Sequence, residues 1–206
     1  MKIKHIILIT ISTLILLTCC IIGYNKYFDS SIKIGANGFV NKKNLIVYYS
    51  TENMDKIAQN LHSKIGGDII KLEPVVAYPQ DKEKYIERLK TEKRSKKPIL
   101  IKNIPNVEDY DLIFVGTPIE LYTLSPIIKS FLKEPELSGK IVLPFISYEY
   151  SGGARNILEF KKILGKNTTV KNGLIIQKDG GNSLSTRITM WLNSIKFTRR
   201  ELKNMK

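Results

Sequence analysis

The chain has 206 residues and is 43% hydrophobic and 25% charged, values that fit a folded globular protein and exclude a disordered one. Its two cysteines are the adjacent Cys19 and Cys20, so the rest of the chain holds no disulfide, zinc–thiolate site or cysteine nucleophile. The formal net charge of +14 favours anionic partners, but no nucleic-acid-binding motif accompanies it, and no nucleic-acid partner is expected.

The chain begins with a basic start and an uncharged apolar run. Ile6–Ile22 follows Lys2 and Lys4, and as a helix it measures about 25 Å, near the lower limit for spanning a bilayer. We therefore expect residues 1–23 to form a transmembrane anchor or a lipoprotein-type signal, because the residues before the two cysteines resemble a lipobox. Either form places the protein at the cell membrane, single-pass or lipid-anchored. The short basic start predicts a domain outside the cytoplasm, joined through a linker at 24–42.

Residues 43–197 are predicted to form one α/β domain, because short apolar runs alternate with helical patterns. The predicted strands are Asn44–Tyr49, Asp68–Leu72, Asp111–Gly116, Lys140–Ile146 and Thr168–Ile176. The predicted helical stretches are Met54–Ile65, Gln80–Lys97, Ile127–Leu132, Ile157–Leu164 and Leu184–Ile195. Continuous apolar strands that alternate with helices indicate a doubly wound, five-stranded parallel sheet covered on both faces, here preceded by one hydrophobic helix.

Ligands of such folds bind beyond the carboxyl ends of the strands, so the loops after strands one, three and four are the candidate site. The chain has only two histidines, His5 and His62, and no nucleophile motif. A bound cofactor is therefore expected to carry any chemistry, and no metal site is expected.

Several stretches, in order and spacing, carry a family resemblance. They are Val47–Ser50, Leu72–Pro74, Asp109–Asp111, Gly116–Ile119, Phe131–Leu132, Leu137–Lys140 and Pro144–Phe145. From about Asn44 to Leu164 the chain resembles the flavodoxin family, with a charged insertion after strand two. The resemblance implies the strand order 2-1-3-4-5, an FMN cofactor and electron transfer with a redox partner protein that the sequence does not name.

The resemblance also implies which residues bind FMN. The loop after strand one would wrap the phosphate with Ser50, Thr51, Asn53, Met54 and Asp55. The second loop would flank the isoalloxazine ring with Thr117, Pro118, Tyr122 and Thr123. The third loop would cover the other face of the ring with Ser147, Tyr148, Tyr150, Gly152 and Gly153.

The phosphate loop departs from the family pattern, because Glu52 and Asp55 stand where the family usually has threonines. The loop thereby loses donors and gains repulsion toward a phosphate. Two alternatives to an electron carrier stay open: a flavodoxin-derived binding module that has lost FMN, and an FMN-dependent reductase of quinones or similar acceptors. If a flavin binds, Glu120 and Glu149 are expected to lower its reduction potential.

The remaining charge lies in two stretches. Basic residues between strand two and strand three alternate with acidic ones, which favours a solvated helix face. The basic tail at 198–206 contains fewer acidic residues among its basic ones. Beside a membrane it is expected to contact an anionic lipid surface. A lysine-rich solvated surface explains the same charges without a partner.

Overall fold

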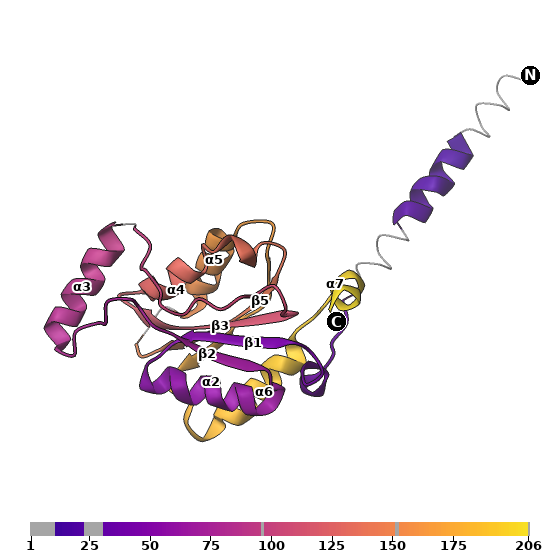
Figure 1. The fold of residues 1–206 in the computed structure, drawn as a ribbon. Coiled ribbons are helices and arrows are strands. Elements are labelled where there is room, and N and C mark those ends of the chain that lie inside the picture. The colour runs from indigo at the N-terminus through magenta and orange to yellow at the C-terminus, as the bar shows by residue number, and fades with distance from the viewer. Residues whose placement is uncertain (1–10, 23–30, 96, 151–152, 206) are drawn as a thin grey trace, which may run out of the picture. The chain divides into compact units, whose positions relative to one another are not determined.

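The computed structural model describes residues 11–22, 31–95, 97–150 and 153–205 (Figure 1). The chain divides into two compact units. The larger unit comprises Ile34–Ile195, and the smaller one joins the segment that ends at Lys33 with Lys196–Met205.

A parallel sheet forms the centre of the larger unit. Its strands are β1 (Asn44–Tyr49), β2 (Asp68–Leu72), β3 (Leu112–Glu120), β5 (Ile141–Tyr148), β6 (Thr169–Val170) and β7 (Leu174–Gln177). The order is β2-β1-β3-β5-β6, and β7 also pairs with β5. A two-residue strand, β4 (Thr123–Leu124), returns antiparallel to the end of β3. The predicted α/β class and the predicted order of the main strands are confirmed.

Among the described residues the sheet has seven strands, so the predicted number of five is wrong. One additional strand is β4, and the other arises at the fifth position, where β6 pairs with Ile141 and Val142 and β7 pairs with β5 only from Phe145 onward. Between these two sets of paired residues, β5 contains Pro144, which has no N–H to donate to a neighbouring strand. Gly173 approaches that point so closely that a Cβ atom there would lie 3.0 Å from the Pro144 carbonyl oxygen. The single predicted strand is thereby split in two.

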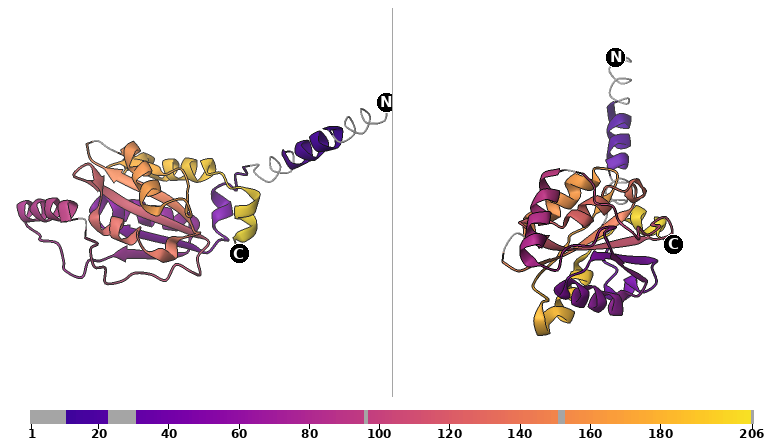
Figure 2. Two further views of the ribbon diagram at one scale, coloured as in Figure 1. Left: turned by 90° about the horizontal axis from the view of Figure 1, so that it is seen from above. Right: turned by 60° about the vertical axis from the view of Figure 1, so that its left-hand side comes forward.

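Helices cover both faces of the sheet (Figures 1 and 2). On one face lie α2 (Glu52–Ile65) and α6 (Leu184–Ser194), and on the other α4 (Pro126–Phe131) and α5 (Gly153–Leu164). Successive strand residues point to opposite faces, so neighbours in one strand enter different cores. In β3, Ile113 packs in the core that includes the α4 residues, while Phe114 contacts Trp191 of α6 edge-on at 5.9 Å between ring centroids.

The segment 24–42, predicted as a linker, includes a short 3-10 helix, η1 (Ala36–Phe39). Phe39 is fully buried and meets Phe114 edge-on at 6.0 Å. Its carbonyl oxygen accepts a hydrogen bond from the buried Asn44 side chain at 2.8 Å. Residues 23–30 of this prediction lie outside the described residues.

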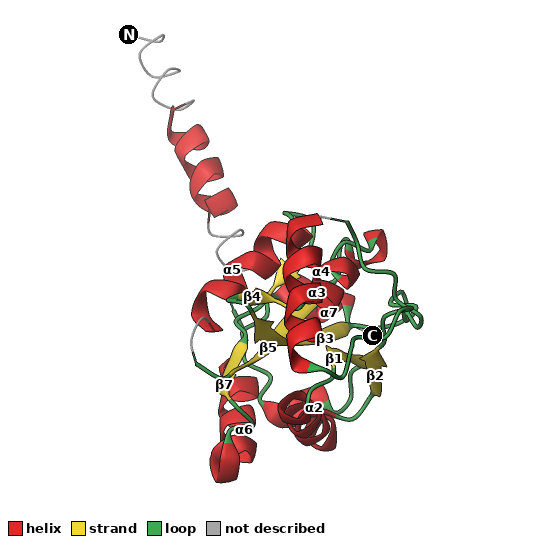
Figure 3. Ribbon diagram, turned by 90° about the vertical axis from the view of Figure 1, so that its left-hand side faces the viewer, coloured by secondary structure: helices red, strands yellow, loops and turns green. Residues whose placement is uncertain are grey.

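The charged stretch after β2 forms the helix α3 (Lys82–Ser95), which lies beyond the carboxyl ends of the strands (Figure 3). Only Leu89 of this helix is buried. Two further 3-10 turns, η2 (Pro135–Leu137) and η3 (Gly181–Ser183), precede β5 and α6 respectively.

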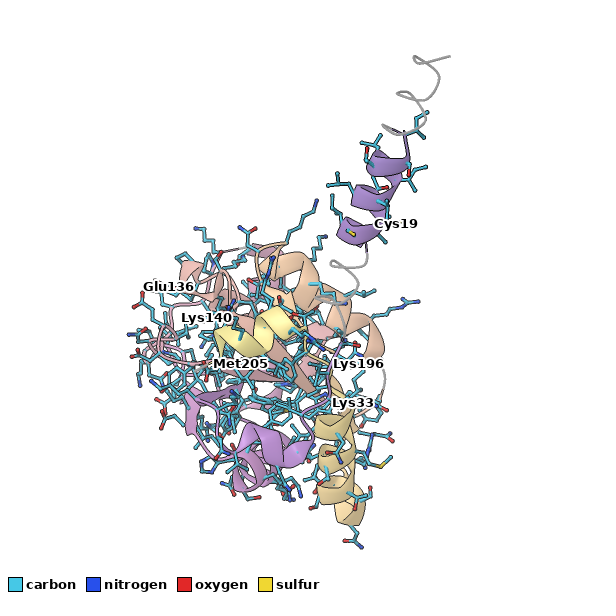
Figure 4. All side chains as sticks on the ribbon, turned by 90° about the vertical axis from the view of Figure 1, so that its right-hand side faces the viewer. Cys19, Lys33, Glu136, Lys140, Lys196 and Met205 are labelled. Atoms are coloured by element: carbon cyan, nitrogen blue, oxygen red, sulfur yellow. The ribbon has the colours of Figure 1, made fainter. Side chains whose placement is uncertain are left out.

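In the smaller unit, an antiparallel bridge joins Ile32 to Phe197 through two backbone hydrogen bonds of 2.6 and 2.8 Å. The helix α7 (Arg199–Asn204) follows, with Thr198 and Glu201 forming a capping box. Lys33 and Lys196, which flank the bridge, are labelled in Figure 4. Residues 11–22 are helical. None of the helices within the described ranges is long and apolar enough to cross a bilayer. Part of the predicted anchor at 1–23 lies outside those ranges, so the anchor stays a prediction.

Candidate functional site

Three loops meet at the carboxyl edge of the sheet, because β1, β3 and β5 are neighbours in a parallel arrangement. Tyr48 at the end of β1 is level with Gly116 of β3, and Pro118 of β3 is level with Ser147 of β5. The chain leaves β1 toward β2 on one side, while β3 lies on the other side. This is the topological switch point, where open α/β sheets bind ligands.

The loop after β1 forms the N-terminus of α2. Thr51 is the N-cap and accepts the Met54 N–H at 3.3 Å. The Ser50 hydroxyl lies 2.8 Å from both carboxylate oxygens of Asp55, to which it donates. Asn53 is half-buried. The Met54 side chain is fully buried, so only the backbone of Met54 can reach this loop's surface.

The loop after β3 is a hairpin that turns back at two residues, Leu121 and Tyr122. Both have positive φ, 48° and 66°, as primed hairpin turns require, although neither residue is a glycine. Each non-glycine residue in this conformation costs on the order of 1–2 kcal/mol. The surrounding contacts therefore have to hold the turn in place.

Those contacts come from both sides of the turn. On one side the Lys93 ammonium of α3 donates to the Leu121 carbonyl at 3.1 Å. On the other, the Glu159 carboxylate of α5 accepts the Thr123 hydroxyl at 2.9 Å and pairs with Lys129 at 2.7 Å. Burial opposes ionisation of Glu159, but the donors from Lys129 and Thr123 outweigh it and hold the pKa of Glu159 below its usual value.

The other predicted residues of the second and third loops lie deeper in the sheet. Thr117 and Pro118 are buried, and the Thr117 hydroxyl donates to the Pro118 carbonyl at 2.9 Å and accepts the Ser125 N–H at 3.1 Å. Ser147 is buried too and donates to the Lys178 carbonyl at 2.7 Å. Tyr148 is half-buried. Gly152 lies outside the described residues, and Gly153 begins α5.

A hollow of about 340 Å³ lies between the second and third loops. Its lining consists of Ile119, Leu121, Tyr122, Glu149 and Tyr150. The two tyrosines are 80% and 89% exposed, so their rings are free to flank a ligand. Tyr122 and Tyr150 were predicted from the sequence, whereas Ile119 and Leu121 were not, although both directly adjoin predicted residues.

Sequence reasoning missed a cluster of three tyrosines, Tyr49, Tyr78 and Tyr85, that joins α3 to the end of the sheet. Ring centroids lie 5.8 Å apart for Tyr49 and Tyr78, and 5.4 Å apart for Tyr78 and Tyr85. Burial raises the pKa of Tyr49 to about 12 and shifts the other two upward as well, so all three are neutral at physiological pH. We call this group the tyrosine cluster.

Charged side chains complete the docking of α3. The Arg88 guanidinium stacks over Tyr78 at 4.2 Å from its centroid and pairs with Glu92 at 2.8 Å. The Tyr85 hydroxyl donates to the Glu120 carboxylate at the end of β3. Burial raises the pKa of Glu120, although the bond from Tyr85 opposes that shift. The helix that sequence reasoning interpreted as a solvated face thus braces the strand end that leads into the hairpin turn.

The fold and the hollow define a doubly wound α/β protein with a ligand site at its switch point. The sequence model of flavodoxin matches residues 43–195, and the chain therefore belongs to the flavodoxin family. Family membership supports FMN as the cofactor. Among curated proteins, none matches the chain.

Solved structures share this fold. A protein of Bacteroides eggerthii assigned as a flavoprotein is 27% identical, with a TM-score of 0.66 over 75% of this chain and 98% of that one. Another, from Bacteroides uniformis, is 21% identical, with a TM-score of 0.63 over 73% and 97%. A Lactobacillus acidophilus flavoprotein, solved in complex with FMN, is 22% identical, with a TM-score of 0.56 over 67% and 94%. The last two likenesses show the fold alone.

The residues present fit a flavin unequally at its two ends. The hollow offers apolar walls at Ile119 and Leu121 and a tyrosine from each loop, which suits a flat aromatic ring. At the other end, the first turn of α2 offers backbone N–H groups to an anion. The Ser50 hydroxyl, however, is already donated to Asp55. The lining of the hollow therefore suits an aromatic ring, whereas a phosphate at the start of α2 would depend mainly on backbone donors.

Proposed function

We propose that this protein binds FMN at the carboxyl edge of its sheet and takes part in electron transfer. The observation that carries the proposal is the hollow between the β3 and β5 loops, with an exposed tyrosine from each loop at its rim. Such a position is where this fold class binds its ligands. A bound flavin would supply the redox chemistry, and the chain contributes binding, orientation and electrostatics.

Each wall of the site has a separate role. Ile119 and Leu121 would exclude water from one side of the ring, and Tyr122 and Tyr150 would stack against it. The carboxylate of Glu149 would disfavour added negative charge on the ring and so lower its reduction potential. Because the rim is exposed, a redox partner can approach it.

A titration of the full chain with FMN tests this proposal. We expect the purified protein to be yellow and to quench FMN fluorescence with a Kd in the micromolar range or below. Replacing Tyr122 and Tyr150 together with Ala should weaken binding about tenfold or more, since stacking on an aromatic side chain contributes on the order of 1 kcal/mol each. Met190→Ala, which removes an exposed apolar side chain on α6, is the control and should leave the Kd unchanged. No quenching of either FMN or riboflavin fluorescence at micromolar concentrations would exclude flavin-dependent electron transfer.

A binding module without FMN is the second candidate, and one observation favours it. The Ser50 hydroxyl donates its hydrogen bond to Asp55, although the family resemblance assigns this donor to the phosphate. The same titration distinguishes the two candidates. A reductase of quinones differs from a carrier only in its acceptor, so turnover of a quinone with the FMN-loaded protein separates those two.

We also propose that the protein is tethered to the cell membrane by its N-terminal apolar run, with the domain outside the cytoplasm. Eight residues separate Ile22 from Ser31, and the nine Cα–Cα steps between them let the chain extend at most about 30 Å. The bridge of Ile32 to Phe197 therefore keeps the basic helix α7 near the membrane surface. Lys33, Lys196, Arg200 and Lys203 are exposed there and would attract anionic lipid.

Cell fractionation tests the tether: we expect the protein in the membrane pellet after washing with high salt and alkali, and recovery in the soluble fraction would refute it. Vesicles containing phosphatidylserine test the lipid contact. When the full chain is reconstituted in these vesicles, Lys196 and Lys203 should be labelled less by an amine-reactive reagent than when it is reconstituted in phosphatidylcholine vesicles.

A further inference from the structure

The flavin tail subsite at the start of α2 contains a carboxylate in place of a hydrogen-bond donor. Asp55 is half-buried and accepts the Ser50 hydroxyl at 2.8 Å. Thr51, the N-cap, accepts the Met54 N–H, and the Asp55 N–H bonds the Thr51 carbonyl at 2.9 Å. Of the donors in this loop, the Ser50 hydroxyl and the N–H groups of Met54 and Asp55 are therefore already engaged within the protein.

The cations beside this subsite are engaged too. Lys71 of β2 lies 3.7 Å from Asp55. Lys56 lies 3.1 Å from Glu52 and 3.2 Å from Asp179, which follows β7. Within these ion pairs three carboxylates face two ammonium groups, and the local charge is negative before any phosphate enters. A dianionic phosphate would add to that excess and lose hydration without gaining a free cation.

We propose that Asp55 removes the contribution of the phosphate to flavin affinity, so that the site holds riboflavin at least as tightly as FMN. The inference rests on the proposed flavin site and concerns its tail subsite alone. The terminal hydroxyl of riboflavin is a donor and can bond the Asp55 carboxylate, whereas a phosphate dianion can only repel it. The ring subsite between the β3 and β5 loops is common to both ligands.

The unmodified full chain gives the first test, through fluorescence titrations with FMN and with riboflavin at 0.05 M and 1 M salt. We expect the Kd for riboflavin to equal that for FMN or to lie below it. Because salt screens repulsion between charges, FMN should bind more tightly at 1 M than at 0.05 M, while riboflavin should respond little.

Asp55→Asn and Asp55→Thr give the second test. Both remove the carboxylate and keep a group that can bond Ser50, so FMN affinity should rise about tenfold while riboflavin affinity stays within threefold or falls. Glu136→Gln is the matched control: it removes one negative charge from an exposed position before β5, at the amino edge of the sheet (Figure 4), and should change neither Kd. Circular dichroism of each variant checks that it is folded.

The outcomes are distinguishable. FMN binding at least tenfold tighter than riboflavin in the unmodified chain would overturn the inference and leave the proposed function intact. Equal FMN affinity in folded Asp55→Asn and the unmodified chain would also overturn it. Failure of both flavins to bind would instead remove the proposed function.

Discussion

The carboxyl of Glu120 lies at the junction of β3, the hairpin turn and α3, and its burial makes a prediction about stability. Its Oε2 atom is shielded from solvent and meets no donor in hydrogen-bonding geometry among the described residues. The other oxygen accepts the Tyr85 hydroxyl. Burial raises the pKa of Glu120 in the folded state, so this side chain is more easily ionised in the unfolded chain.

The sign of the pH dependence follows from that difference. Between the unfolded pKa, roughly 4.3, and the raised folded pKa, the folded state holds more protons than the unfolded state. Glu120 therefore stabilises the fold most below pH 4.3, and that contribution falls as pH rises through this window. Each unit of pKa difference amounts to about 1.4 kcal/mol. Glu120→Gln cannot ionise, so its gain in stability over the unmodified chain should grow between pH 4 and pH 7 in proportion to that pKa difference.

Urea unfolding of the full chain in mild detergent measures this difference, with fluorescence of Trp191, the only tryptophan, as the signal from the core. The gain of Glu120→Gln should appear as a difference in unfolding free energy that grows with pH. Glu136→Gln, an exposed control, should show a flat difference. A difference for Glu120→Gln that is flat, or that shrinks as pH rises, would refute the assignment of a strained buried carboxyl.

The remaining predictions concern three other positions. Glu159→Gln should show the opposite sign, because the bonds from Lys129 and Thr123 lower the pKa of Glu159 and so stabilise its ionised form in the folded state. Its loss of about 1 kcal/mol should be complete above about pH 4.3 and should disappear as pH falls through the lowered folded pKa; the same urea series measures it. Gly67→Ala should cost about 2 kcal/mol or more in thermal unfolding, since φ is +86° and a Cβ atom would lie 2.3 Å from the Asn44 carbonyl oxygen. Gly66→Ala is the comparison: φ is +66° but a Cβ atom would have no neighbour within 4 Å, so the cost should be about 1 kcal/mol. Glu149→Gln should raise the potential of bound flavin by about 10–20 mV in spectroelectrochemical titration, since one exposed charge contributes on the order of 0.5–1 kcal/mol; an unchanged potential would contradict its role at the rim.

The fold could be predicted because its main signals are local. β1 and β2 have the bounds that their apolar runs predict, and Gly66 ends α2 as expected. The extension of β3 through Pro118 to Glu120 could not be found this way, because polar residues and a proline break the apolar pattern there. The split between β6 and β7 depends on Pro144 in the neighbouring strand, so no reading of the 168–176 segment alone reveals it.

The loops of the candidate site followed from the rule for parallel sheets, but the bonding within them did not. That Asp55 stands in a phosphate loop was visible in the sequence, whereas its hydrogen bond to Ser50 is a property of the folded loop. The role of α3 was hidden for a different reason. Its helical pattern is highly charged, and the residues that matter, Tyr85 and Lys93, contact a turn about 30 residues further along the chain, at separations of 35 and 28 residues.

The docking of α3 also accounts for the unusual hairpin beside the hollow. Leu121 and Tyr122 adopt left-handed conformations that neither residue prefers, and together they cost about 2–4 kcal/mol. Hydrogen bonds to ionised groups contribute about 1.5–3 kcal/mol each, and α3 supplies one to Leu121 through Lys93 while α5 supplies those of Glu159 to Thr123. Together α3 and α5 thereby offset the strain of the turn that carries one wall of the candidate flavin pocket. If a phosphate adds nothing to flavin affinity at the start of α2, as we propose, flavin binding depends all the more on that wall, because the ring subsite must then provide most of the affinity.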